Sequence, residues 1–115
     1  MGKLYKNKRK PKRKEKWITA GREDMIPEGC GAAVDLKKGA QIAVFNSGGN
    51  FYAIENFCPH KGRPLADSPL DDGTVKCEFH GWRFDLETGE CSKKKGCSIE
   101  SYRVSVEDGW IKIFV

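Results

Sequence analysis

The chain has 115 residues, of which 38% are hydrophobic, and this is enough for one domain with a modest core. Its net charge of +5 is unevenly placed: residues 1–16 hold nine Lys or Arg and one acid, whereas residues 17–115 hold twelve basic and fifteen acidic side chains. No apolar run approaches the roughly 18 residues that span a bilayer, and the first residues lack the apolar stretch of a secretory signal. We therefore expect no transmembrane segment and a cytoplasmic protein.

The charge division predicts two regions. Residues 1–16 offer almost nothing to bury and their like charges repel, so we expect a disordered basic tail. A solvated tail is favoured over a contact with nucleic acid or a membrane surface, and nucleic acid is not expected as a partner. Residues 17–115 are the predicted domain.

Within residues 17–115, β-prone runs alternate with turn residues. Ile42–Phe45 and Phe51–Ile54 flank a Gly-rich turn, and Tyr102–Val106 and Trp110–Val115 flank Glu-Asp-Gly, so each pair predicts a hairpin. Shorter strands are expected at Trp17–Ala20, Gly31–Leu36, Thr74–Cys77 and Trp82–Asp85. Helical periodicity is limited to a weak signal at Arg22–Met25. Many short strands with Gly-rich turns predict an all-β sandwich or barrel.

The two histidines of the chain both lie beside cysteines. They occur in Cys58-Pro59-His60 and Cys77-Glu78-Phe79-His80, so a C-x-H motif is followed, after sixteen residues, by C-x-x-H. Three interpretations compete: a tetrahedral zinc site, a [2Fe–2S] cluster held by two Cys and two His, and four residues without a metal. C-x-H is an unusual first half for a zinc finger, and the spacing therefore favours the cluster.

These two segments resemble the cluster loops of Rieske [2Fe–2S] proteins, and the resemblance extends from about Trp17 to Val115. It implies the Rieske fold of three small antiparallel sheets, with a cluster-binding subdomain at one tip and cluster-binding loops at about 56–68 and 77–85. It also implies that Cys58 and Cys77 hold the inner iron, and that His60 and His80 hold the outer iron near the surface.

Several positions differ from the respiratory members of that family. The two extra cysteines of those members correspond to Arg63 and Phe79, so their disulfide cannot form here. Their serine and tyrosine, whose hydroxyls donate to sulfur, correspond to Trp82 and Phe84. Hydrogen bonds to sulfur stabilise the reduced cluster, so we expect a potential at the bottom of the Rieske range, about −150 mV.

Two soluble classes share these features. One is the ferredoxin that carries electrons from a reductase to a ring-hydroxylating oxygenase, and the other is the small subunit of NAD(P)H-dependent nitrite reductase, whose C-terminal segment resembles residues 96–109. The ferredoxin is the favoured function, with the nitrite reductase subunit as an alternative and a zinc-stabilised binding module as a third. With both histidines assigned to iron, no side-chain pair remains for acid–base catalysis, so the domain alone is not expected to turn over a substrate.

Three cysteines remain after the ligands are assigned. Cys30, Cys91 and Cys97 are interpreted as small apolar side chains or exposed thiols, with a Cys91–Cys97 disulfide as the alternative. Lys61, Arg63 and residues 93–95 are candidates for a positive rim that would orient an acidic redox partner.

Overall fold

The computed structural model describes residues 15–36, 40–59, 64–77, 81–91 and 96–115. The tail over residues 1–14 lies outside this set, so its predicted disorder and the domain boundary at residue 17 stay predictions. The backbones of Lys16 and Val115 bond to each other in both directions, at 3.2 and 2.9 Å. This part of the chain contains no helix long and apolar enough to cross a bilayer.

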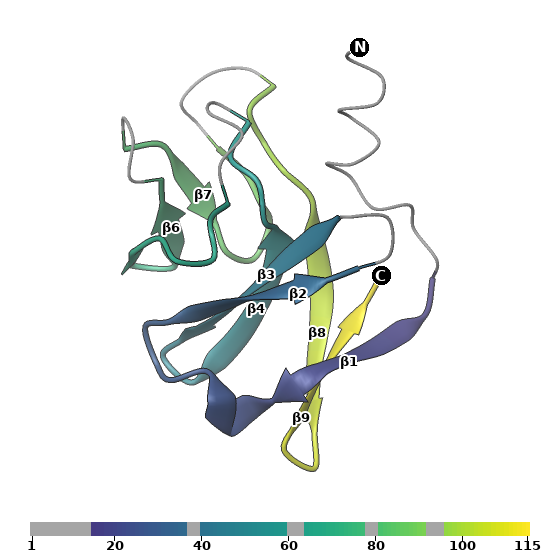
Figure 1. Cartoon of the computed structure of the whole chain (residues 1–115). Helices are drawn as coiled ribbons and strands as arrows, with labels where there is room; N and C mark the ends of the chain where they lie inside the picture. The colour runs from purple at the N-terminus through teal and green to yellow at the C-terminus, as the bar shows by residue number, and fades with distance from the viewer. Residues whose placement is uncertain (1–14, 37–39, 60–63, 78–80, 92–95) are drawn as a thin grey trace.

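The described residues form two antiparallel sheets (Figure 1). The larger, barrel-like sheet has the strand order β1-β9-β8-β4-β3-β2, and the smaller has the order β5-β6-β7. The strands of the larger sheet are β1 Trp17–Arg22, β2 Gly31–Asp35, β3 Gln41–Ser47, β4 Asn50–Glu55, β8 Ser101–Glu107 and β9 Trp110–Phe114. Those of the smaller sheet are β5 Leu70–Asp71, β6 Thr74–Lys76 and β7 Arg83–Asp85. The all-β prediction is confirmed.

The tight hairpins are set by pairs of residues with positive φ. The β8–β9 turn uses Asp108 and Gly109, with φ of 53° and 82°, and the β3–β4 turn uses two glycines, with φ of 64° and 90°. Both central residues in the left-handed region make a turn whose twist matches that of the flanking strands. The two hairpins predicted from these residues are therefore confirmed.

The weak helical signal at Arg22–Met25 corresponds to a single 3-10 turn, Glu23–Met25. The two-residue strand β5 was not predicted. The three small sheets that the resemblance implies correspond to β1-β9-β8, β4-β3-β2 and β5-β6-β7, and the first two run together into one six-stranded sheet because β4 and β8 pair through Ala53↔Tyr102 and Ile54↔Ser101.

Strand β3 separates two cores. Its residues from Ile42 to Asn46 are all buried, and a continuous apolar run such as Ile42–Phe45 is typical of a strand that is covered on both faces. One face belongs to what we call the barrel core: Ile26, Ile42, Val44, Ala53, Tyr102, Ile111, Ile113 and Val115. The other belongs to the site core: Ala43, Phe45, Ile54, Cys58, Leu65, Ala66, Val75, Cys77, Trp82, Phe84, Leu86, Cys91, Cys97 and Ile99. The larger sheet thus supplies one wall of the region that contains the predicted cysteine ligands.

Candidate metal centre

Two of the four predicted ligands lie together in the site core. Cys58 follows the end of β4 by three residues and is fully buried, and Cys77 follows β6 directly and is 2% exposed. The two strands belong to different sheets, so one thiol comes from each sheet. His60 and His80 lie outside the described residues, and their role as ligands stays a prediction. Within the described ranges, no three His, Cys, Asp or Glu side chains form a metal-binding group.

The second cysteine is placed by a hairpin. Lys76 pairs with Arg83 in the β6–β7 ladder, and the Cys77 N–H donates to the Trp82 carbonyl at 2.7 Å. Both ends of the second cluster loop are therefore fixed to the smaller sheet. Trp82 and Phe84 are buried in the site core, at 9% and 0% exposure. Both side chains therefore serve as packing residues of this core.

A third segment, which follows the two cluster loops in the chain, also contributes to the site core. Cys91 and Cys97 are buried, and the Cys97 thiol donates to the Cys91 carbonyl at 3.1 Å. Cys30, in contrast, is exposed. None of the five cysteines, all of which lie in the described residues, forms a disulfide, so the alternative of a Cys91–Cys97 disulfide is wrong and the interpretation as small apolar side chains or exposed thiols is confirmed.

Gly89 fixes where this third segment lies. Its φ is 79°, and a Cβ at this position would lie 2.1 Å from the Ile99 carbonyl oxygen. The Ile99 N–H in turn donates to the Gly89 carbonyl at 2.9 Å. Only glycine allows both the backbone conformation and this close approach.

Sequence reasoning missed two polar residues at the end of β4. Glu55 is fully buried, and its Oε1 accepts the Glu100 N–H at 2.7 Å. Asn56 is 8% exposed and bonds to the far end of the first cluster loop. The available signal in the sequence was a pair of polar residues, Glu55 and Asn56, between an apolar strand and the predicted ligand Cys58. Polar side chains that are buried in native proteins are hydrogen-bonded.

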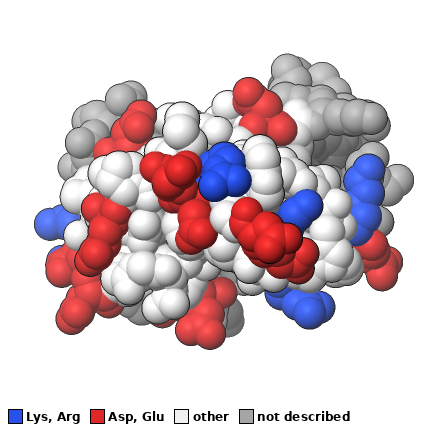
Figure 2. Space-filling model, turned by 90° about the horizontal axis from the view of Figure 1, so that it is seen from below, with Lys and Arg blue, Asp and Glu red and all other residues white. Residues whose placement is uncertain are grey.

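The charge around the centre is described only in part. Lys61, Arg63 and residues 93–95, the predicted positive rim, lie outside the described residues. Figure 2 shows that Asp and Glu predominate on the face seen from below, and exposed acids at the β8–β9 turn and the neighbouring 3-10 turn include Glu107, Asp108, Glu23 and Asp24. The described domain therefore has an acidic face, in keeping with its composition.

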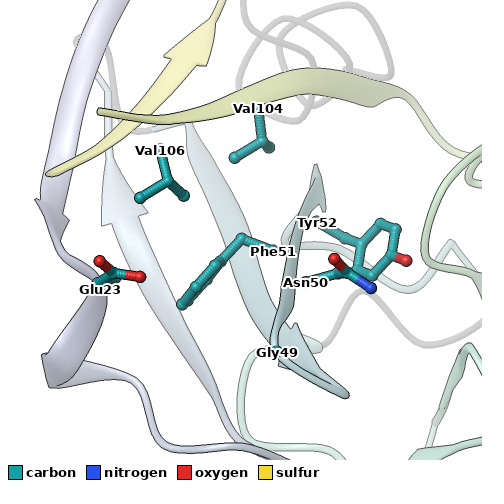
Figure 3. Close-up of a pocket in the computed structure, with 7 residues that line it drawn as sticks. All are labelled: Glu23, Gly49, Asn50, Phe51, Tyr52, Val104 and Val106. Carbon is teal, nitrogen blue, oxygen red and sulfur yellow. The ribbon is translucent and has the colours of Figure 1, made fainter. Parts of the chain in front are cut away.

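A separate hollow of about 440 Å³ lies between β4 and β8, beyond the two residue pairs that join them. Figure 3 shows residues of its lining, among them Glu23, Phe51 of β4 and the β8 side chains Val104 and Val106. No cysteine lines it. Of the predicted ligands, the described Cys58 and Cys77 lie in the site core and not at this hollow, so the candidate centre is the site core.

Comparison with protein families gives a match over the greater part of the chain. Residues 16–103 match the family model described as Rieske [2Fe-2S] domain. The ferredoxin component of the naphthalene 1,2-dioxygenase/salicylate 5-hydroxylase systems of Ralstonia sp. is 32% identical over 99 residues, which are 82% of this chain and 90% of the relative. The 3-phenylpropionate/cinnamic acid dioxygenase ferredoxin subunit of Escherichia coli K12 is 38% identical over 90 residues, 76% of this chain and 83% of the relative.

Solved structures show the same fold. A ferredoxin of Sphingomonas yanoikuyae B1 superposes with a TM-score of 0.76 at 31% identity, covering 87% of this chain and 99% of the other. A structure titled as a complex of reduced oxygenase and oxidized ferredoxin in carbazole 1,9a-dioxygenase gives 0.76 at 26% identity, with 87% and 94% covered. A structure described as an NADH-dependent nitrite reductase small subunit from Mycobacterium tuberculosis gives 0.78 at 27% identity, with 85% and 93% covered.

Proposed function

The chain belongs to the Rieske [2Fe–2S] domain family and is an electron-transfer ferredoxin, and we propose that it passes single electrons from a reductase to the terminal oxygenase of an aromatic-ring oxygenase system. The observation that carries this proposal is the match to ferredoxin components of dioxygenase systems over most of both chains. A cytoplasmic location is part of the same proposal. The zinc-stabilised binding module is not supported, because the family carries an iron–sulfur cluster.

The described half of the donor set fits such a cluster. Neither Cys58 nor Cys77 is in a disulfide, and both are buried members of one core cluster, although they come from two different sheets. Thiolates are the ligands that iron–sulfur clusters require, and a buried pair of them without a metal is costly. We propose that these two residues hold the inner iron, and that His60 and His80 hold the outer iron. When bound, the cluster supplies a centre that accepts and releases one electron.

The residues of the chain provide the environment for that chemistry. Trp82 and Phe84 pack in the site core beside the two cysteines and exclude water from the inner side of the centre. The hydrogen bond from the Cys77 N–H to the Trp82 carbonyl joins the two residues that flank the second loop. A rigid, dry setting lowers the structural change that accompanies gain or loss of an electron, and it protects the thiolates from oxidation.

A second candidate function rests on a specific observation. The structure described as a nitrite reductase small subunit superposes as well as the ferredoxins do, at 27% identity. Residues 96–109, which include β8, also resemble the C-terminal segment of that class. In this role the chain would work inside a larger complex with a flavin- and haem-containing partner.

One experiment separates the two. The chain replaces the native ferredoxin in a purified aromatic dioxygenase system that contains NADH, reductase and oxygenase, and oxygen uptake and product are measured. We expect turnover that depends on the chain and is absent with the Cys58→Ala variant. A chain with a Rieske spectrum that neither accepts electrons from a reductase nor supports an oxygenase, but co-purifies with a large nitrite-reducing partner, would support the second function instead.

A further inference from the structure

Asn56 bridges the two ends of the first cluster loop. It lies two residues before Cys58, and its Oδ1 accepts hydrogen bonds from the backbone N–H groups of Leu65, at 2.7 Å, and Ala66, at 2.8 Å. The eight residues 57–64 lie between these points in the chain. One side-chain oxygen therefore joins the residue before this loop to the two residues after it.

A polar network fixes the orientation of this side chain. Its Nδ2 donates to Gln41 Oε1 at 2.9 Å, and Gln41 Nε2 donates to Asp35 Oδ1 at 2.7 Å. The Asp35 carboxylate can only accept hydrogen bonds, and the backbone N–H groups of Leu65 and Ala66 can only donate them. The direction of each hydrogen bond between these two ends of the network is therefore determined. The Asn56 N–H also donates to the Gln41 carbonyl at 3.1 Å. The bridge is thus attached to the β2–β3 hairpin of the larger sheet.

The returning end of the loop has little room to move. Leu65 and Ala66 are buried in the site core with Cys58 and Cys77. A Cβ on Gly31 would lie 2.6 Å from the Ala66 carbonyl oxygen, so the backbone of residue 66 packs directly against β2. Without the Asn56 carbonyl, two N–H groups would be left without this acceptor in an apolar core, which favours a shifted loop.

We propose that Asn56 is a positioning residue for the cluster: by holding the backbone of Leu65 and Ala66 to a point two residues before Cys58, it determines where the Cys58 thiolate holds iron. His60 lies four residues after Asn56 and five before Leu65, near the middle of the bridged segment. This role rests on the proposed ligands. It assigns to a buried amide a function in the geometry of the centre, in addition to its contribution to folding.

The chain offers a matched control in Asn46. This residue is also buried, at 9% exposure, and its side chain also bridges two backbone segments, through Ile26, at 2.8 Å, and Gly49, at 3.1 Å. Its contacts join the β3–β4 hairpin to the residue after the 3-10 turn, and Ile26 belongs to the barrel core. Loss of either side chain removes comparable hydrogen bonds, but only Asn56 contacts the cluster loop.

The test compares Asn56→Ala, Asn46→Ala and Asn56→Asp in the full, iron-loaded chain. Measurements are the EPR g values of the reduced protein, the rate of iron loss to a chelator, and deuterium uptake at Leu65 and Ala66. For Asn56→Ala we expect altered g values, faster uptake at both amides and iron loss about tenfold faster, because a buried bridge is lost. For Asn46→Ala we expect a lower melting temperature with parent g values. Asn56→Asp keeps the acceptor oxygen and is expected to restore the g values.

Parent g values and parent iron loss in Asn56→Ala would overturn the positioning role, as would equal changes in the two alanine variants. If Asn56→Ala does not fold, Gln41→Ala removes the group that orients the amide, and unchanged g values in that variant would overturn the proposal. A parent protein without a Rieske signal contradicts the proposed function itself, whereas a parent signal that the variants leave unchanged contradicts only the role of Asn56.

Discussion

The two cores on either side of β3 are built differently. The barrel core is mostly aliphatic and is formed by strands of five to seven residues, with tight turns such as Asp108-Gly109. The site core contains four cysteines and is covered by strands of two and three residues. Alternate residues of the same strand enter the two cores: Val44 faces one and Phe45 the other.

The site core is the part of the fold that we expect to depend on a bound group. Long hairpins with a shared aliphatic core are stable by local pairing and burial. Strands of two or three residues are not, and their loops here depend on side-chain bridges such as Asn56 and on the close approach at Gly89. Since metal binding adds its free energy to folding, we expect the cluster to stabilise the site core much more than the barrel core.

The largest expected effect is at the proposed ligands. Cys58→Ala or Cys77→Ala should abolish the visible absorbance and the EPR signal, because an iron without its thiolate is not retained. Circular dichroism should still show a folded barrel. Cys30→Ala is the matched control, since Cys30 is exposed and should leave the iron content unchanged. Loss of iron in the Cys30 variant, or its retention in both ligand variants, would break the assignment.

A cavity in the barrel core should lower the free energy of unfolding and leave the EPR g values of the cluster unchanged. Ile113→Ala truncates a fully buried side chain and should lower the free energy of unfolding by about 2–5 kcal/mol. We expect similar losses in the iron-free and iron-loaded protein, with parent EPR g values in the latter. Val106→Ala, at a side chain that is 40% exposed, should cost less than about 1 kcal/mol. Denaturant titration of both forms measures this, and g values that change with Ile113 would show that the two cores are not independent.

The close approach at Gly89 predicts a smaller, local effect. Gly89→Ala should destabilise the protein by about 2–3 kcal/mol. An alanine here would have to adopt an unfavourable positive φ, and its Cβ would clash with the Ile99 carbonyl oxygen. Gly29→Ala is the control: its φ is 85° but nothing lies within 4 Å of the added Cβ, so only the conformational cost of about 1 kcal/mol remains. Equal melting temperatures for the two variants would contradict this explanation of the third segment.

The smallest expected effect concerns the potential. Trp82 and Phe84 bring no hydroxyl to the buried side of the site core. Voltammetry should therefore give a midpoint near the bottom of the Rieske range, about −150 mV. A clearly positive potential would show that other donors compensate for the missing hydroxyls.

The sequence predicts the parts of this fold that depend on neighbours in the chain. Glycine and Asp-Gly turns predict the two long hairpins, and the apolar run from Ile42 to Phe45 predicts one of their strands, which the structure buries on both faces. Asp72-Gly73, with φ of 54° and 80°, is a third turn of the same type and could have revealed β5. That strand was missed because its two residues are too few to show a pattern.

Long-range features could not be predicted in the same way. The pairing of Ala53 with Tyr102 joins strands that are 49 positions apart, and no local signal marks it. The role of Asn56 depends on two backbone N–H groups nine and ten residues later. The spacing of cysteine and histidine indicated the chemistry of the centre, and the structure brings its two cysteines into one core.

The most direct test of the account is the metal content of protein purified without oxygen. We expect one cluster per chain, held by thiolates on one side and imidazoles on the other. Analysis should therefore give about two iron and two acid-labile sulfide per chain, and the reduced protein should show the EPR spectrum of a Rieske cluster. Protein that contains neither iron nor sulfide, or that binds stoichiometric zinc and stays colourless, would contradict it.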